Sequence, residues 1–219
     1  EEAVLNGTDL LLGRDVTAIR REKDGFAVLA QRPDGSQETL RSRFLVDAAG
    51  VYADRIYAMA SGYSPFSITP KKGEYFVIDK EKEPLVSRVI YPTPSEKGKG
   101  VLAVPTIHRN LLIGPNSEPI PDRDDLGTTA AGLAYVREKI SKTVRDIPFH
   151  KVIRSFAGLR PSGSTQDFIV EEARDVPGLF LAAAIESPGL TSAPAISRYI
   201  AEELIGSRID LRPRREYRR

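Results

Sequence analysis

Arg160 is the residue whose setting most directly suggests ligand chemistry. It follows Gly158-Leu159 and precedes Pro161, just after a predicted strand. A guanidinium is a planar fork of N–H donors that matches a carboxylate or a phosphate. The adjacent proline restricts the backbone that carries it. A surface arginine or one half of a structural ion pair would have the same neighbours, so this segment alone leaves both interpretations open.

Two further segments could approach a ligand through their backbone. The apolar run at residues 44–49 ends in Ala48-Ala49-Gly50, and ligands of open α/β sheets bind beyond the carboxyl ends of such strands. The run at residues 179–184 leads through Ser187-Pro188-Gly189 into a predicted helix, whose first N–H groups suit an electron-rich oxygen. Ordinary strand-to-helix turns would need the same small residues, so the segments are candidates only.

Hydrophobic spacing indicates the elements that would position these segments. Strands at residues 15–19 and 26–31, with turns at Asp24-Gly25 and Pro33-Asp34-Gly35, predict a three-stranded meander that leads into the buried strand. Apolar residues at helical spacing predict helices at 53–60, 133–144 (after a Thr128 or Thr129 cap) and 193–204, the last with Pro194 in its first turn. Further strands are expected at 68–79, 88–91, 100–105, 111–113, 151–156 and 167–171.

Composition sets the outer limits of function. The chain has 219 residues, 41% apolar and 28% charged, with a net charge of +2, so it holds one large domain or two small ones and no nucleic-acid partner is implied. The absence of cysteine excludes disulfides, thiol nucleophiles and cysteine-bound metal clusters within these residues, and no metal site is predicted. No apolar run has the length of a membrane helix. We expect a cytoplasmic protein, either free or peripheral to a membrane.

Six segments in order carry a resemblance to a known family. The chain resembles the D-amino-acid-oxidase-like superfamily of FAD-dependent oxidoreductases, in the branch of glycerol-3-phosphate dehydrogenase and L-2-hydroxyglutarate oxidase. The matching segments are VDAAGVYADRI (46–56), PKKGEYFVIDK (70–80), VPTIHRNLLIGP (104–115), SFAGLRPSG (155–163), DFIVEE (167–172) and AAIESPGLTSAPAI (183–196). One departure is that no G-x-G-x-x-G occurs. The resemblance thus implies a chain that enters the family pattern downstream of the pyrophosphate-binding segment and holds FAD poorly alone.

The resemblance implies a set of FAD contacts. The backbone near Val16 would lie beside the adenine, and Ala49 and Gly50 would approach the dinucleotide. Residues 185–191 would wrap the isoalloxazine, the ones of interest being Ile185, Ser187, Gly189, Leu190 and Thr191. The last three would offer backbone N–H groups to its pyrimidine oxygen.

The resemblance also implies a substrate site. Arg160 matches a family arginine beside substrate and flavin, and we expect it to anchor the substrate's anionic group. Lys72 and Tyr75 lie on the strand of the substrate-domain face, but strand alternation places Lys72 with Glu74 and Tyr75 with Gly73, so the pair should not share the pocket. His108 is the candidate base for the hydroxyl proton, with an exposed turn residue as the alternative.

The implied activity is oxidation of a small anionic secondary alcohol, most simply glycerol 3-phosphate, by hydride transfer to FAD. L-2-hydroxyglutarate fits equally, because Arg160 suits phosphate and carboxylate alike. Electrons would then pass to a quinone, to oxygen or to an electron-acceptor domain or subunit. Two other interpretations stay open: a non-catalytic substrate domain or subunit that needs a separate FAD-binding segment, and a flavoenzyme of the same superfamily that modifies tRNA or amines.

The expected fold is α/β, of mixed α+β character. Residues 1–63 and 151–206 would form a partial FAD-binding, glutathione-reductase-like sheet with its β-meander, and residues 64–150 an antiparallel β substrate domain. Residues 207–219 form a basic tail or linker. An exposed edge of the partial sheet would offer a route to a homodimer.

Overall fold

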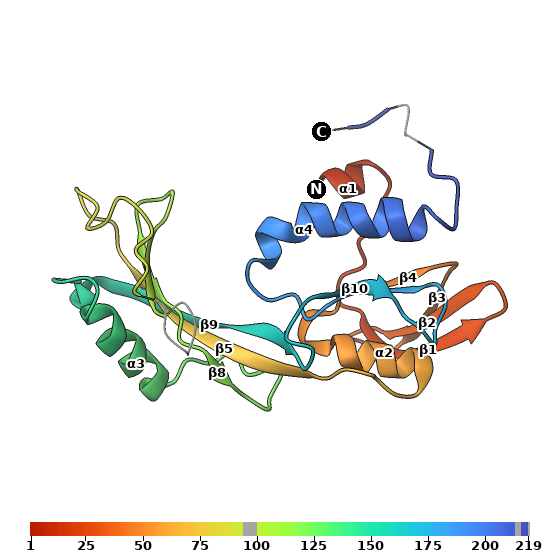
Figure 1. The fold of residues 1–219 in the computed structure, drawn as a ribbon, viewed down its shortest axis with the longest axis horizontal. Helices are drawn as coiled ribbons and strands as arrows, with labels where there is room; N and C mark the ends of the chain where they lie inside the picture. The colour runs from red at the N-terminus through yellow and green to blue at the C-terminus, as the bar shows by residue number, and fades with distance from the viewer. Residues whose placement is uncertain (94–99, 213–215, 219) are drawn as a thin grey trace. The chain divides into compact units, whose positions relative to one another are not determined.

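The computed structural model describes residues 1–93, 100–212 and 216–218, and Figure 1 shows their elements. The chain divides into two compact units. Unit 1 comprises residues 1–68 and 163–219, and unit 2 comprises residues 69–162. One unit is therefore discontinuous in sequence, and the other is inserted into it.

Unit 1 contains the expected meander. Strands β1 (Asp15–Glu22), β2 (Gly25–Gln31) and β3 (Gln37–Ser42) pair antiparallel in that order. Gly25 is required at the β1–β2 turn, because its φ is +154° and a Cβ there would lie 2.0 Å from the Ser42 carbonyl oxygen. Both predicted turns are confirmed.

A second sheet of unit 1 joins segments from the two ends of the chain. Strands β4 (Leu45–Asp47), β10 (Ile169–Glu172) and β11 (Leu179–Ala183) lie in the order β10-β11-β4. β4 runs parallel to β11, with Leu45 opposite Leu179, whereas β10 and β11 are antiparallel. Because parallel strands end at the same edge, the segments that follow β4 and β11 leave the sheet on one side.

Short helices follow these strands. Residues Gly50–Tyr52 form a 3-10 turn (η1) that leads into α2 (Ala53–Ser61), which ends at Gly62 with φ +90°. After β11 come α4 (Gly189–Arg198) and a π-helical continuation, η3 (Tyr199–Ile205). The prediction that Pro194 lies in the first helical turn is wrong, since α4 begins at Gly189 and Pro194 is inside it. Its missing N–H leaves the Leu190 carbonyl without a helical donor, which is tolerated because Leu190 is exposed.

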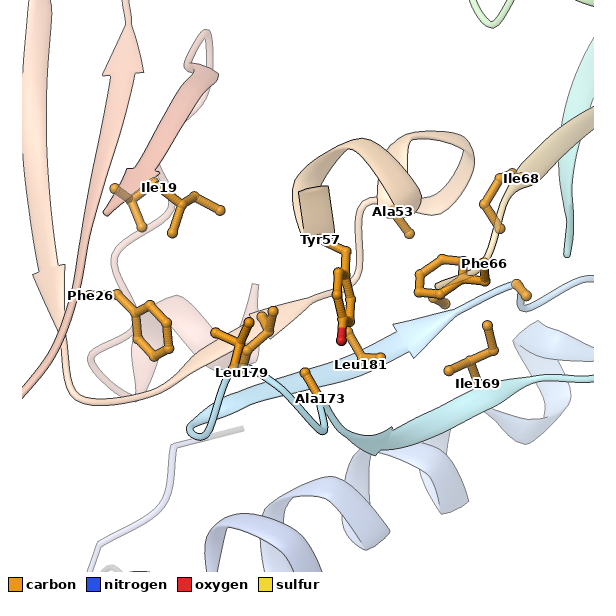
Figure 2. Close-up of a cluster of buried hydrophobic side chains, with 14 residues drawn as sticks. Ile19, Phe26, Ala53, Tyr57, Phe66, Ile68, Ile169, Ala173, Leu179 and Leu181 are labelled. Atoms are coloured by element: carbon orange, nitrogen blue, oxygen red, sulfur yellow. The ribbon is translucent and has the colours of Figure 1, made fainter. Parts of the chain in front are cut away.

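The core of unit 1 lies between α2, the meander and the β4-β10-β11 sheet (Figure 2). Tyr57 of α2 meets Phe66 edge-to-face at 5.6 Å between ring centroids, and its hydroxyl donates to the Asp175 carboxylate. Leu179 and Leu181 supply the β11 side of the same cluster. Each such buried side chain contributes about 1.5–3 kcal/mol. The cluster therefore connects β4 and β11 rigidly to α2.

The two ends of the chain also meet in unit 1. The Tyr217 hydroxyl bonds Glu2 at 2.7 Å, and the Arg218 N–H donates to Asn6 Oδ1 at 3.0 Å, beside helix α1 (Glu2–Leu5). The described part of the predicted basic tail thus contacts the N-terminal segment, while residues 213–215 and 219 lie outside the described residues.

Unit 2 is built on one sheet with a helix packed against it. Strands β6 (Leu102–Pro105), β7 (Leu111–Gly114), β5 (Ile68–Ile78) and β8 (Glu118–Pro119) lie in that order, and β9 (Val152–Gly163) pairs with β5. Val136 and Ile140 of α3 (Ala130–Ser141) are buried with Ile113 and Ile78. A short 3-10 turn, η2 (Phe149–Lys151), precedes β9. The predicted strand at 88–91 is reduced to one bridge between Ile90 and Ala103.

The unit boundaries fall further along the chain than the predicted ones at 63/64 and 150/151. The reason is that β5 and β9 pair with each other, so nearly all of both strands belongs to the unit 2 sheet. Among the described residues, no helix combines the length and apolar character that crossing a membrane requires.

Candidate functional site

The first candidate region lies at the end of β4 in unit 1. Gly50 has φ +58°, and the space where its Cβ would stand is open, with no atom of the described residues within 4 Å. Ala49 donates its N–H to Asp47 Oδ1 at 3.1 Å. The Asp47 carboxyl thus holds the Ala49 backbone in place, and the backbone at Gly50 is uncovered. A ligand could approach the backbone closely at Gly50.

Asp47 itself is an unusual buried carboxyl. It is 2% exposed, and within the described residues its Oδ2 has no hydrogen-bond partner. Burial raises the pKa of Asp47 to about 7, while the Ala49 N–H opposes that rise and the charge of Asp54 adds to it. The carboxyl is therefore close to half protonated near neutral pH.

The second region of unit 1 is the start of α4. Gly189 donates to the Glu186 carbonyl at 2.6 Å and Ser192 to the Pro188 carbonyl at 3.0 Å. Between them, the N–H groups of Leu190 and Thr191 have no acceptor among the described residues, and the Leu190 side chain is 93% exposed. Gly189 packs closely on Ile185, where a Cβ would lie 2.5 Å from Ile185 Cγ2. Two open donors at a helix N-terminus can hold an electron-rich oxygen.

The remaining cofactor candidates are also in unit 1. Val16 on β1 is partly buried and packs against the unit 1 core, and Ser187 is exposed in the loop that precedes α4. All of the predicted FAD-contacting residues therefore belong to unit 1, on β1, after β4 and after β11.

The substrate candidates are in unit 2, and the alternation of β5 separates them. Lys72 is 4% exposed, and its ammonium donates to Asp125 Oδ2 at 2.6 Å and to the Gly127 carbonyl at 3.1 Å. Glu74, on the same face, accepts from the Thr129 N–H at 2.8 Å and from its hydroxyl at 2.9 Å. This face of β5 holds the loop and cap that start α3, so Lys72 is occupied there and we do not retain it as a substrate contact.

The opposite face of β5 carries Gly73 and Tyr75. The Tyr75 ring stacks on Phe156 of β9 at 5.0 Å between centroids and 8° between planes. Burial raises the pKa of Tyr75, and the positive charge of Arg160 lowers it. Tyr75 and Arg160 are thus brought together on the face that Lys72 does not share, in agreement with the alternation argument.

Arg160, on β9, is the positively charged residue next to the Gly73 and Tyr75 face of β5. Its Nη2 donates to the Asn116 carbonyl at 3.0 Å, and among the residues that the structure describes no carboxylate lies within ion-pair distance of it. The guanidinium is partly buried. A partly buried arginine that lacks a carboxylate partner is suited to bind an anion from solution.

His108 lies away from this group. It is exposed on the turn between β6 and β7, at the end of β7 where Leu111 pairs with Ile78. Along β5, the stretch from Ile78 back to Gly73 spans roughly 17 Å. A Cβ at Gly73 would lie 2.6 Å from Arg160 Nη2, so the Arg160 guanidinium is close to Gly73 and His108 is at the other end of this stretch.

Asn116 is a site residue that the sequence interpretation missed. It follows β7 and is 3% exposed, with its backbone carbonyl on Arg160 and its side-chain Oδ1 on the Glu74 N–H at 2.7 Å. The available signal was a polar amide directly after Gly114-Pro115 at the end of an apolar strand. Within the described parts of the chain, no group of His, Asp and Glu side chains could hold a metal ion.

Comparison with known proteins shows to which family the chain belongs. The family described as FAD dependent oxidoreductase (DAO) matches residues 1–203. The chain therefore belongs to the DAO family of FAD-dependent oxidoreductases, and the expected mixed α/β fold class and family resemblance are confirmed.

Two relatives and one solved structure show which members of this family the chain is similar to. The chain is 41% identical over 204 residues to a glycerol 3-phosphate dehydrogenase of Caloramator mitchellensis, covering 93% of this chain and 41% of that protein. It is 30% identical to a mitochondrial L-2-hydroxyglutarate dehydrogenase of Arabidopsis thaliana, over 78% of this chain and 39% of that protein. A solved structure of dithionite-reduced L-α-glycerophosphate oxidase from Mycoplasma pneumoniae, with FAD bound, superposes with a TM-score of 0.82 at 28% identity, covering 93% of this chain and 52% of that one. The chain thus spans about half or less of the length of these relatives.

Proposed function

We propose that this chain is part of an FAD-dependent enzyme that oxidises glycerol 3-phosphate. The observation that carries the proposal is Arg160, a partly buried guanidinium with no carboxylate partner among the described residues, on the Tyr75 face of β5. The greater identity to a glycerol 3-phosphate dehydrogenase than to an L-2-hydroxyglutarate dehydrogenase supports phosphate as the anion.

The residues of unit 1 fit the cofactor. The open space at Gly50 would admit the dinucleotide close to the backbone, and the free N–H groups of Leu190 and Thr191 would hold an electron-rich oxygen of the flavin ring. Ala49, Ile185, Ser187 and Gly189 would shape the approach, with Val16 toward the adenine. FAD, when bound, supplies the hydride acceptor.

The residues of unit 2 would supply binding and orientation. Arg160 holds the phosphate through paired N–H donors, which fixes the distance from the anion to the reacting carbon. Tyr75 lies beside Arg160, whose charge lowers the Tyr75 pKa. His108 is not assigned the proton-accepting role, because it lies at the far end of β7.

L-2-hydroxyglutarate is the second candidate substrate, favoured by the Arabidopsis thaliana relative and by the equal match of a guanidinium to carboxylate. An electron-acceptor domain or subunit, a homodimer and a cytoplasmic or membrane-peripheral location are further proposals of the same kind. For a small anionic hydroxy compound as the partner, Arg160 supports the anionic group, and the relatives suggest the hydroxyl.

Flavin retention is the first test. The purified chain is mixed with FAD, passed through a gel-filtration column, and its visible absorbance is recorded. Retained flavin would support residues of this chain as a cofactor site, and Gly189→Ala should then reduce retention, because the new Cβ meets Ile185. Loss of all flavin would favour a substrate domain that needs a separate FAD-binding segment, and function would then be assayed in the protein that contains this chain.

Substrate choice is the second test. FAD reduction is followed after addition of glycerol 3-phosphate or of L-2-hydroxyglutarate to the flavin-loaded protein. Faster reduction by glycerol 3-phosphate would support the proposal. Faster reduction by L-2-hydroxyglutarate would replace it with the second candidate, and reduction by neither would refute both.

A further inference from the structure

Asn116 connects the strand β5 to the side chain of Arg160. Its Oδ1 accepts from the Glu74 N–H at 2.7 Å, and its backbone carbonyl accepts from Arg160 Nη2 at 3.0 Å. Glu74 is itself held by two hydrogen bonds to Thr129 at the start of α3. The position of the guanidinium is therefore linked through one residue to the hydrogen bonds that cap α3 in unit 2.

Gly73 provides the space that this arrangement needs. A Cβ at Gly73 would lie 2.6 Å from Arg160 Nη2 and 2.9 Å from Pro115 Cβ. The backbone of Gly73 is not in the left-handed region, so its conformation alone would accept other residues. A larger residue at position 73 would therefore displace the end of the Arg160 side chain and press on Pro115.

The amide of Asn116 is a costly choice for a buried position. It is 3% exposed, and its Nδ2 has no hydrogen-bond partner within the described residues. A buried donor without a partner destabilises the folded state, and an apolar residue of similar shape would avoid that loss. The cost is consistent with a residue that serves the site rather than stability.

We propose that Asn116 and Gly73 are positioning residues that hold the Arg160 guanidinium in the orientation in which it receives the substrate's anionic group. The Asn116 side-chain Oδ1, held by the Glu74 N–H, places the backbone carbonyl that accepts from Arg160 Nη2, so an alanine would lose this support although it keeps the carbonyl. Gly73 leaves room for the end of the Arg160 side chain. The remaining N–H donors of the guanidinium are then presented in one geometry. The inference rests on the proposed function for its purpose, but the positioning itself can be measured without FAD or substrate.

The titration of Tyr75 reports the position of Arg160. The Arg160 charge lowers the pKa of Tyr75, so displacement of the guanidinium should raise that pKa. The pKa is measured by NMR on the chain carrying ring-labelled tyrosine, with Tyr75→Phe to assign the signal and Arg160→Ala to set the full effect. Gly73→Ala and Asn116→Ala should each shift the pKa upward by at least half of that full effect.

A matched control is available two residues before Arg160. Gly158 lies on the same strand and the same face, and in the described part of the chain no atom stands within 4 Å of its Cβ position. Gly158→Ala should leave the Tyr75 pKa unchanged. An unchanged pKa in both Gly73→Ala and Asn116→Ala would overturn the proposal. If Gly73→Ala does not fold, as judged by circular dichroism, Asn116→Ala alone decides.

Binding of inorganic phosphate separates this inference from the proposed function. In the chain, Gly73→Ala and Asn116→Ala should each weaken phosphate binding at least ~10-fold while Arg160 remains present. Undiminished phosphate binding in both variants would also overturn the proposal. Absence of phosphate binding in the unmodified chain would count against Arg160 as the anion anchor, and the Tyr75 titration would still confirm or refute the positioning.

Discussion

The polar groups on the two faces of strand β5 differ in how completely they are paired within the chain. On one face, the buried Lys72 and Glu74 are both paired, with Asp125 and with Thr129. On the other face, and among the described residues, Arg160 has one carbonyl partner and Asn116 keeps its amide nitrogen unpaired. A buried charge is tolerated when it is fully paired, so the first face can serve stability.

This difference in pairing indicates that an anionic ligand should bind on the Arg160 face. Hydrogen bonds that are complete within the chain fix the α3 cap, whereas donors left without a carboxylate are available to an anion from outside. A similar contrast separates two buried carboxyls, because Glu74 in unit 2 has hydrogen-bond donors for both oxygens and Asp47 in unit 1 has one oxygen without any in the described chain.

The strongest test of the comparison is Arg160→Lys. A lysine keeps the charge but loses the planar fork, so we expect kcat/KM for glycerol 3-phosphate in the flavin-loaded protein to fall about 100- to 1,000-fold with little change in stability. Steady-state kinetics and thermal unfolding measure the two effects. The matched control is Arg154→Lys, an exposed arginine on the same strand, which should change neither. Equal effects of the two substitutions would contradict the assignment of Arg160.

Much of the fold could be predicted because local signals agree with it. The meander was indicated by its turn residues, α2 by apolar spacing and Gly62, and α3 by its threonine cap. The start of α4 could not be located, because Ser187-Pro188-Gly189 is typical of a loop and Pro194 of a first turn. The strand expected at 88–91 failed because its apolar residues find a single bridging partner, Ile90 to Ala103.

The site was predictable only in part. Alternation along β5 correctly separated Lys72 from Tyr75, since it depends on geometry that every strand shares. The pairing of Lys72 with Asp125 depends on a loop that is distant in sequence, so no local pattern reveals it. Asn116 and the space above Gly73 likewise arise where separate strands meet. For His108 the sequence left a base and an exposed turn residue as alternatives, and the structure shows an exposed turn residue.

Asp47→Asn should stabilise the protein at alkaline pH. The pKa of Asp47 is raised from 3.8 to about 7, so the folded state binds this proton more tightly than the unfolded state. Stability from the protonated form is therefore present below about pH 4 and is lost as the pH rises through about 7. Asparagine has no such dependence, and its advantage in unfolding free energy should approach about 4 kcal/mol above about pH 8.

Urea unfolding at a series of pH values measures this difference. The two proteins should be close in stability near about pH 4 and diverge as the pH rises. Glu74→Gln is the comparison on the paired carboxyl, and it should lower stability, because the single Gln oxygen can replace only one of the two carboxylate oxygens that accept from Thr129. A constant offset between the unmodified protein and the Asp47→Asn variant across the pH range would show that Asp47 is not the titrating group.

Gly132→Ala tests how tightly the paired face is packed. In most helices this change stabilises by about 1 kcal/mol. Here the new Cβ would lie 2.1 Å from Glu74 Oε1 and 2.5 Å from its Cδ, so we expect a loss of about 1–3 kcal/mol in unfolding free energy. In a Glu74→Ala background the same change should become favourable, since the clash is gone. Additive effects in this double-mutant cycle would mean that the Glu74 carboxylate can move away freely.

The smallest expected effect is that of Tyr75→Phe, which sharpens the definition of the open face. The stacked contact of the ring with Phe156 is retained by phenylalanine, so the melting temperature should hardly change. Loss of one hydroxyl beside Arg160 should raise KM for glycerol 3-phosphate by a factor of up to about ten, the value of a single hydrogen bond, while kcat stays within about twofold. Tyr75→Leu, which also removes the stacked ring, should lower stability as well. An unchanged KM in Tyr75→Phe would reduce the role of Tyr75 to packing and leave Arg160 as the sole anion contact proposed on this face.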